Sequence, residues 1–197
     1  LATEIKTGLF YWIPELDGIA RSEGDDIILI IGKDAKIIKD MGLQKAIKSG
    51  RLSPYYAGEI NGKHRFVYEG DRPTKLDSIP YAAWDLLESD PYGHNLLEDY
   101  IKVPVWGITA NNSSSTPFSM KRSLTTVSSR GCPFACAFCY RGAQGERNYG
   151  VRSAQNIIDE MAFDVDRYKV DFIGIVDDNF MVQPNRIVDL AVSIQPT

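Results

Sequence analysis

The sequence has few of the features that mark membrane-spanning, secreted or nucleic-acid-binding proteins. The aliphatic run Ile27–Ile31 is far shorter than the ~20 apolar residues that a membrane-spanning helix needs. No basic stretch followed by an apolar segment is visible near the start, so nothing indicates a signal peptide. The formal net charge of -4 gives no electrostatic reason to expect nucleic-acid binding. We therefore expect neither a membrane span nor a nucleic-acid partner.

Cysteine and histidine are also scarce. The chain has three cysteines, all within residues 132–139, and two histidines, His64 and His94. An odd, clustered set of cysteines does not suit the disulfide framework of a secreted protein, which favours a reducing cytoplasm. The histidines lie well upstream of the cysteines and show no ligand-like spacing.

The length and composition are typical of a soluble globular protein. A hydrophobic content of 44% and a charged content of 24% do not indicate disorder. The 197 residues suffice for one full domain or two partial ones. Because the chain starts without methionine and stops shortly after an apolar helical stretch, we expect a fragment of a longer protein.

The residues before the cysteine loop contain several local signals of structure. The run Ile27–Ile31, closed by Gly32, predicts a parallel strand buried on both faces. A helix is predicted over about 34–49, with Gly42 bending or interrupting it and Gly50 ending it. Segments 57–60 and 64–68 flank Asn61-Gly62 and predict a β-hairpin with a type I′ turn. Proline-punctuated residues 71–87 predict an ordered linker that packs onto a domain, and residues 88–124 predict loops.

The second half alternates strand and helix signals. A strand over 124–128 leads into the cysteine loop, and Ser153 is a candidate N-cap for the next helix. That helix is predicted to bury Ile157, Ile158, Met161, Ala162 and Val165, and to turn Asp159, Glu160, Asp164 and Asp166 away. A buried strand over 171–176 and a helix after Pro184 follow. This order predicts an α/β fold, the start of an α/β barrel or a doubly wound sheet.

The three cysteines are the main candidate for chemistry. They are spaced C-x3-C-x2-C, with Phe138 immediately before Cys139. Three thiolates on one loop could hold one face of a metal centre and leave a position open. Structural zinc usually takes four ligands, and the chain has no fourth cysteine. An iron–sulfur cluster is therefore favoured, with zinc as the alternative.

The pattern C-x3-C-x-aromatic-C resembles that of the radical S-adenosylmethionine (SAM) enzymes. The resemblance implies that Cys132, Cys136 and Cys139 bind three irons of a 4Fe–4S cluster and that SAM chelates the fourth. It also implies that the backbone around Phe138 lies against the adenine. An electron, from a donor such as ferredoxin or flavodoxin, would then cleave SAM to a 5′-deoxyadenosyl radical, so the cofactor carries the hard chemistry. The substrate would be a small molecule or metabolite that the sequence does not name.

The segment Asp177-Asp178-Asn179 is the second candidate. It follows the predicted strand 171–176, and ligands gather at the carboxyl ends of strands in α/β barrels. By position, the resemblance implies contacts from these residues to the SAM ammonium, although many family members have Gly-Gly-Glu here. The alternative is that an aspartate caps a turn. Arginines around the loop could raise the potential of the cluster or contact an anionic substrate, and a solvated basic rim is the alternative; they are Arg130, Arg141, Arg147 and Arg152.

The upstream half resembles that of radical SAM enzymes with a cobalamin (B12)-binding domain. The resemblance is carried by the hairpin, by the segment Leu76-Asp-Ser-Ile-Pro-Tyr-Ala-Ala-Trp-Asp85, and by Asp177-Asp-Asn-Phe180. It implies the tail of a Rossmann-like B12-binding domain over 1–53, a hairpin and linker over 54–120, and the start of a partial TIM-type radical SAM barrel over 121–197. No D-x-H-x-x-G loop for an axial histidine occurs.

The function implied by this resemblance is cobalamin-dependent methyl transfer or C–C bond formation. Two alternatives remain open, namely a radical SAM enzyme without B12 and a non-catalytic iron–sulfur or zinc-binding module.

Overall fold

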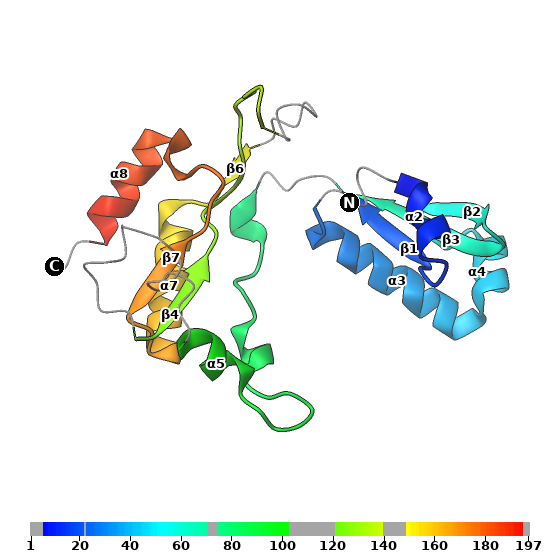
Figure 1. Cartoon of the computed structure of the whole chain (residues 1–197), viewed down its shortest axis with the longest axis horizontal. Helices are drawn as coiled ribbons and strands as arrows, with labels where there is room; N and C mark the ends of the chain where they lie inside the picture. Colours follow the sequence, from blue (N-terminus) through cyan, green and yellow to red (C-terminus); the bar gives the residue numbers. More distant parts are fainter. Residues whose placement is uncertain (1–5, 22, 71–74, 103–120, 140–148, 195–197) are drawn as a thin grey trace. The chain divides into compact units, whose positions relative to one another are not determined.

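The computed structural model describes residues 6–21, 23–70, 75–102, 121–139 and 149–194. The chain divides into two compact units, Leu1–Pro73 and Thr74–Thr197, which are described separately (Figure 1). Each unit combines small sheets with helices, so the fold is mixed α/β. Within the described ranges, no helix combines the length and the apolar character needed to cross a bilayer.

The first unit is built on a three-stranded sheet in the order β1-β3-β2. Strand β1 (Gly18–Arg21) pairs in parallel with β3 (Lys63–Glu69), and β2 (Tyr56–Ile60) pairs with β3 antiparallel. Asn61 and Gly62 join β2 to β3 with φ values of 52° and 72°. A type I′ turn needs positive φ at both positions, so the predicted hairpin is confirmed.

The predicted strand over Ile27–Ile31 is wrong, because these residues belong to helix α3 (Asp25–Met41). Two acids stand in its first turn, where the helix dipole favours negative charge. Ile27 is buried, whereas the side chains of Ile28 and Leu29 are 62% and 72% exposed. A run of five aliphatic residues has no period of its own, so it could not distinguish a strand from a helix.

Two of the three glycine signals after this run were interpreted correctly, whereas Gly32, predicted to close a strand, lies inside α3. Helix α3 ends at Gly42, whose φ is 82°, and α4 (Leu43–Ser49) ends at Gly50, whose φ is 65°. Both backbone conformations favour glycine. Before β1 lie two short helices, η1 (Lys6–Gly8) and α2 (Leu9–Trp12).

The core of the first unit is apolar and aromatic. Ile27 of α3 packs with Phe66 and Tyr68 of β3, whose rings stack at a centroid distance of 5.7 Å. Leu9, Phe10 and Ile19 form a second cluster. A cavity of about 610 Å³ lies among β1, α3 and β3, and its lining is mostly apolar.

The second unit contains the predicted strand–helix–strand–helix order. Strands β4 (Ser123–Thr126) and β7 (Phe172–Ile175) are parallel, with Ser123 opposite Phe172. Helix α7 (Ala154–Tyr168) lies between them in sequence, and η5 (Phe180–Val182) and α8 (Pro184–Ser193) follow. This βαβα order is confirmed. The finer assignments, to a partial TIM-type barrel and to the tail of a Rossmann-like domain, stay predictions.

A second strand pair was not predicted. Strand β5 (Ser129–Gly131) pairs antiparallel with β6 (Tyr149–Val151), although the two strands are far apart in sequence. β5 begins three residues after β4 ends and leads directly into the cysteines. The pair therefore anchors the start of the cysteine loop to the segment that precedes α7.

The proline-punctuated segment packs onto the second unit as predicted. It forms η2 (Leu76–Ser78) and η3 (Trp84–Leu87), and Leu76 is buried. Helix α5 (Leu96–Lys102) was not predicted, because the surrounding sequence indicated loops. A core of Leu97, Ile101, Leu124, Tyr168 and Val170 joins α5 to β4 and to the end of α7. Of the loops predicted over 88–124, residues 103–120 lie outside the described residues.

Helix α7 begins as predicted, but its buried face is different. The Ser153 hydroxyl accepts a hydrogen bond from the Asn156 amide at 3.2 Å, which confirms the N-cap. The predicted exposure of Glu160 and Asp164 is wrong, since both are buried, whereas Val165 is 48% exposed. Hydrophobic periodicity misplaced Glu160 because its buried partners, Thr126 and Arg152, lie outside the helix.

Candidate functional site

The cysteine loop begins directly after β5. Gly131 ends that strand with a φ of 89°, a conformation that favours glycine. All three cysteines are free; Cys132 and Cys139 are partly buried and Cys136 is exposed. The Cys139 amide donates to the Cys136 carbonyl at 3.0 Å, so the end of the loop is a turn. The Phe138 side chain is 92% exposed.

The ligand types in this loop fit an iron–sulfur cluster, but the positions of the three thiols do not yet form a binding site. Three free thiols on one loop are the ligand type that such clusters use. Across the part of the chain that the structure describes, however, no three His, Cys, Asp or Glu side chains are gathered as a metal site. Because metal binding commonly orders its own ligands, binding here would require the loop to close.

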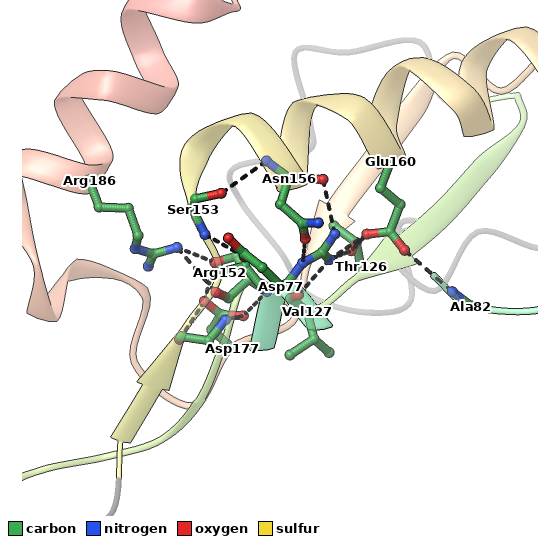
Figure 2. Close-up of polar contacts among 12 residues, drawn as sticks. Asp77, Ala82, Thr126, Val127, Arg152, Ser153, Asn156, Glu160, Asp177 and Arg186 are labelled. Carbon is green, nitrogen blue, oxygen red and sulfur yellow. Dashed lines mark hydrogen bonds and ion pairs between the residues drawn. The ribbon is translucent and has the colours of Figure 1, made fainter. Parts of the chain in front are cut away.

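Asp177 connects the end of β7 to the start of β5. Its carboxylate accepts hydrogen bonds from the Ser128 and Ser129 amides at 2.7 and 3.0 Å, and from the two hydroxyls at 2.5 and 2.7 Å. Figure 2 shows Asp177 beside the buried arginines of this unit. Four donors engage both carboxylate oxygens, which is the geometry expected of an aspartate that caps a turn.

Arg186 of α8 supports the same junction from the other side. Its guanidinium donates to the Ser128 hydroxyl at 2.9 Å and to the Phe180 carbonyl at 3.0 Å. The side chain is buried, and its charge lies 5.3 Å from the centre of the Phe180 ring. Sequence reasoning missed this residue. The available signal was its position one helical turn before Leu190, which is also buried.

The structure brings two of the predicted site residues together. The Asn179 side-chain amide donates to the Cys132 sulfur at 4.0 Å. The Tyr149 hydroxyl donates to the Asn179 carbonyl at 3.3 Å, which ties β6 to the same segment. Asp178 is exposed. The cysteine loop and the segment after β7 are therefore neighbours at the carboxyl ends of the parallel strands β4 and β7, where α/β proteins bind ligands.

Arg152 does not belong to a solvated rim, so that alternative is wrong for this residue. Its guanidinium pairs with the Glu160 carboxylate at 2.5 Å and donates to the Thr126 hydroxyl and the Val127 carbonyl at 3.1 and 3.0 Å (Figure 2). It also donates to Asn156 at 2.6 Å. Arg141 and Arg147 lie outside the described residues. Arg152 is a structural cation that holds β4 to α7.

The Arg152–Glu160 pair and its neighbours also hold the segment 77–82, and the pKa of Asp164 beside them is raised. The Ala82 amide donates to Glu160 at 3.4 Å, and the Ser153 amide donates to Asp77 at 2.8 Å. Asp164, one turn after Glu160, is 2% exposed. Burial, and then the nearby Glu160 charge, raises the pKa of Asp164 to about 6. This acid therefore titrates near neutral pH.

Comparison with known proteins gives two curated relatives of low identity. The chain is 24% identical over 188 residues to an uncharacterized methyltransferase of Pyrococcus horikoshii, across 92% of the chain and 32% of the relative. It is 24% identical over 177 residues to the anaerobic magnesium-protoporphyrin IX monomethyl ester cyclase of Rubrivivax gelatinosus, across 89% of the chain and 26% of the relative. No family model and no solved structure matches.

The chain thus spans about a third or less of the length of the curated relatives it matches. Both relatives are named as enzymes, one a methyltransferase and the other a cyclase.

Proposed function

We propose that this chain forms the cofactor-binding part of a radical SAM enzyme, with a 4Fe–4S cluster on Cys132, Cys136 and Cys139. The observation that carries the proposal is the position of the cysteine loop beside the segment after β7, where Asn179 contacts Cys132. The segment after β7 follows one of the two parallel strands, and the cysteine loop follows the other, β4, after the short strand β5. This end of an α/β sheet is where ligands bind. When bound, the reduced cluster would supply the electron that cleaves SAM.

The proposed SAM contacts are Phe138, Asp177, Asp178 and Asn179, and the geometry gives them different weights. Asp177 already accepts four hydrogen bonds within the chain, so its main contribution is to hold the β4–β5 junction. Asp178 is exposed and can offer a carboxylate to an ammonium group. The Asn179 amide also has an oxygen that can accept from an ammonium. Phe138 would contribute through its backbone.

The reaction proposed for the whole protein is methyl transfer or C–C bond formation on a small molecule, with cobalamin as a further cofactor. The printed names of the two relatives, a methyltransferase and a cyclase, fit these reaction classes. Cobalamin would bind the first unit. A titration of the full-length protein with hydroxocobalamin tests cobalamin binding separately from cluster binding. Absence of binding would favour a radical SAM enzyme without B12.

Anaerobic reconstitution with iron and sulfide tests the cluster. We expect about four irons and four sulfides per chain, and a reduced-state electron paramagnetic resonance (EPR) signal that changes when SAM is added. Cys136→Ala should lose this signal and most of the iron. Ser89→Ala, at an exposed serine of the same unit, should retain both. One tightly bound zinc per chain without iron, or a normal cluster in Cys136→Ala, would contradict the proposal.

A further inference from the structure

We infer that Asn179 is a hydrogen-bond donor to the Cys132 sulfur that raises the reduction potential of the bound cluster. This inference rests on the proposed function, because it assigns a role at the same loop. It starts from the 4.0 Å contact between the Asn179 amide nitrogen and the Cys132 sulfur. Both side chains are partly buried, so the contact is partly shielded from bulk water.

The segment that carries Asn179 is fixed on both sides. Two residues earlier, Asp177 accepts four hydrogen bonds from Ser128 and Ser129. At Asn179 itself, the backbone carbonyl accepts from the Tyr149 hydroxyl. One residue later, the Phe180 carbonyl accepts from the buried Arg186. The side-chain amide is therefore presented to Cys132 by a backbone that the rest of the unit holds in place.

The segment that carries the Cys132 sulfur is held by the same residues that hold Asn179. Ser128 and Ser129 lead through β5 directly to Cys132, and β5 pairs with β6, which supplies Tyr149. Asp177 and Arg186, both labelled in Figure 2, bond Ser128. One polar cluster therefore holds the segments that carry the donor and the acceptor. The donor and the acceptor are therefore held near each other before a cluster binds, whereas Cys136 and Cys139 would have to close on the cluster to complete its ligand set.

The expected effect follows from charge. Reduction adds an electron to the cluster and increases the negative charge on its sulfur ligands. An N–H group aimed at a ligand sulfur stabilises that state, and hydrogen bonds to the sulfurs are among the factors that set cluster potentials. The effect is larger in a partly buried site than in water, because the local dielectric is lower.

Three variants separate the donor from the shape of the side chain. Asn179→Leu keeps the approximate volume and removes the N–H donor, whereas Asn179→Gln keeps an amide donor on a longer side chain. Met181→Ala changes an exposed residue of the same segment and serves as the control. Each protein is reconstituted anaerobically, its iron is counted, and its midpoint potential is measured by EPR-monitored titration without SAM.

We expect a lower potential in Asn179→Leu, a potential near that of the unsubstituted protein in Asn179→Gln, and no change in Met181→Ala. A cluster that assembles in the Gln variant but not in the Leu variant would also support the donor role. Equal potentials in the Leu variant and the unsubstituted protein would overturn this inference and leave the proposed function intact. Equal shifts, or equal loss of iron, in both Asn179 variants would overturn it too. An unsubstituted protein that binds no iron would overturn both proposals.

Discussion

Helices α3 and α7 both bury acidic side chains, yet they satisfy these acids in different ways. Asp34 of α3 is fully buried and accepts from the Ser53 amide at 2.9 Å, the Ser53 hydroxyl at 2.5 Å and the Tyr68 hydroxyl at 3.3 Å. All three donors are neutral. Glu160 of α7 instead pairs with the guanidinium of Arg152. Asp34 of the first unit is thus surrounded by neutral donors, whereas Glu160 of the second unit is part of a buried ion pair.

The ion pair in the second unit affects a further buried acid, Asp164. Arg152 is the cation of its network, whereas Glu160 and Asp164 are two acids on the same helix face. Among the described residues, one Asp164 oxygen is buried without a hydrogen-bond partner. Its raised pKa is the electrostatic result, since burial and Glu160 both disfavour its charge. Neutral donors satisfy one acid completely, while the ion pair leaves a second acid close to its titration point.

The largest expected effect is the loss of the buried cation. Arg152→Met leaves Glu160 buried without its charge partner, and we expect the second unit to lose about 3–5 kcal/mol of its free energy of unfolding. Urea denaturation followed by circular dichroism measures this. The matched control is Arg167→Met, because Arg167 pairs with Glu88 on the surface at 2.8 Å. Exposed pairs contribute about 0–1 kcal/mol, so equal losses in the two variants would contradict the comparison.

The next effect concerns the acid with neutral donors. Asp34→Leu leaves the Ser53 amide and the Tyr68 hydroxyl without their acceptor, and we expect a loss of about 2–4 kcal/mol from the first unit. Burial and the Asp34 charge both raise the pKa of the Tyr68 phenol. The variant should therefore also lower the pKa of Tyr68, which an absorbance titration detects. A stable variant with an unchanged Tyr68 titration would show that these bonds contribute little.

The third effect is a pH dependence confined to the second unit. Because the pKa of Asp164 is about 6 when folded and about 4 when unfolded, the folded chain binds more protons between these values. The free energy of unfolding should therefore fall as the pH rises from about 4 to about 6, and then level off. Asp164→Asn should flatten this decline and gain about 1–2 kcal/mol relative to the unsubstituted protein at pH 7.

Glu98 supplies the control of opposite sign. Hydrogen bonds from Arg122, at 2.7 and 2.8 Å, hold the pKa of Glu98 to about 2. Its stabilisation is present above about pH 4.5 and is lost as the pH falls towards 2. Glu98→Gln should therefore remove the slope between about pH 2 and 4.5 and lower the free energy of unfolding above that range, whereas Asp164→Asn removes the slope between about pH 4 and 6 and raises the free energy of unfolding above it. Identical profiles for the two variants would rule out this assignment of the slopes.

Local signals were sufficient where the chain determines its own conformation. The turn at Asn61-Gly62, the helix ends at Gly42 and Gly50, and the cap at Ser153 each depend on a few adjacent residues, and all were predicted. The aliphatic run of α3 was mispredicted because a continuous run is compatible with a helix as well as with a strand.

The buried polar groups were not predictable from their own neighbourhoods. Glu160 accepts a hydrogen bond from Thr126, 34 residues away in the sequence, and Asp177 accepts one from Ser128, 49 residues away. Helical periodicity assigns such acids to the surface, because it does not include partners from distant segments. The cysteine spacing identified the candidate loop, whereas the roles of Arg186 and Asn179 required the folded arrangement.

The smallest effect concerns how the two helices begin. Ser153 caps α7 through its hydroxyl, so Ser153→Ala should cost about 1 kcal/mol. Helix α3 starts after Gly24 without a side-chain cap, and space is open around that residue. Gly24→Ser adds a hydroxyl, but the backbone there is helical (φ -93°, ψ -10°), whereas a capping residue is extended like Ser153 (ψ 154°). We therefore expect Gly24→Ser to change the free energy of unfolding by only a few tenths of a kcal/mol. A gain as large as the Ser153→Ala loss would mean that α3 can adopt the capped geometry and that the two starts are equivalent.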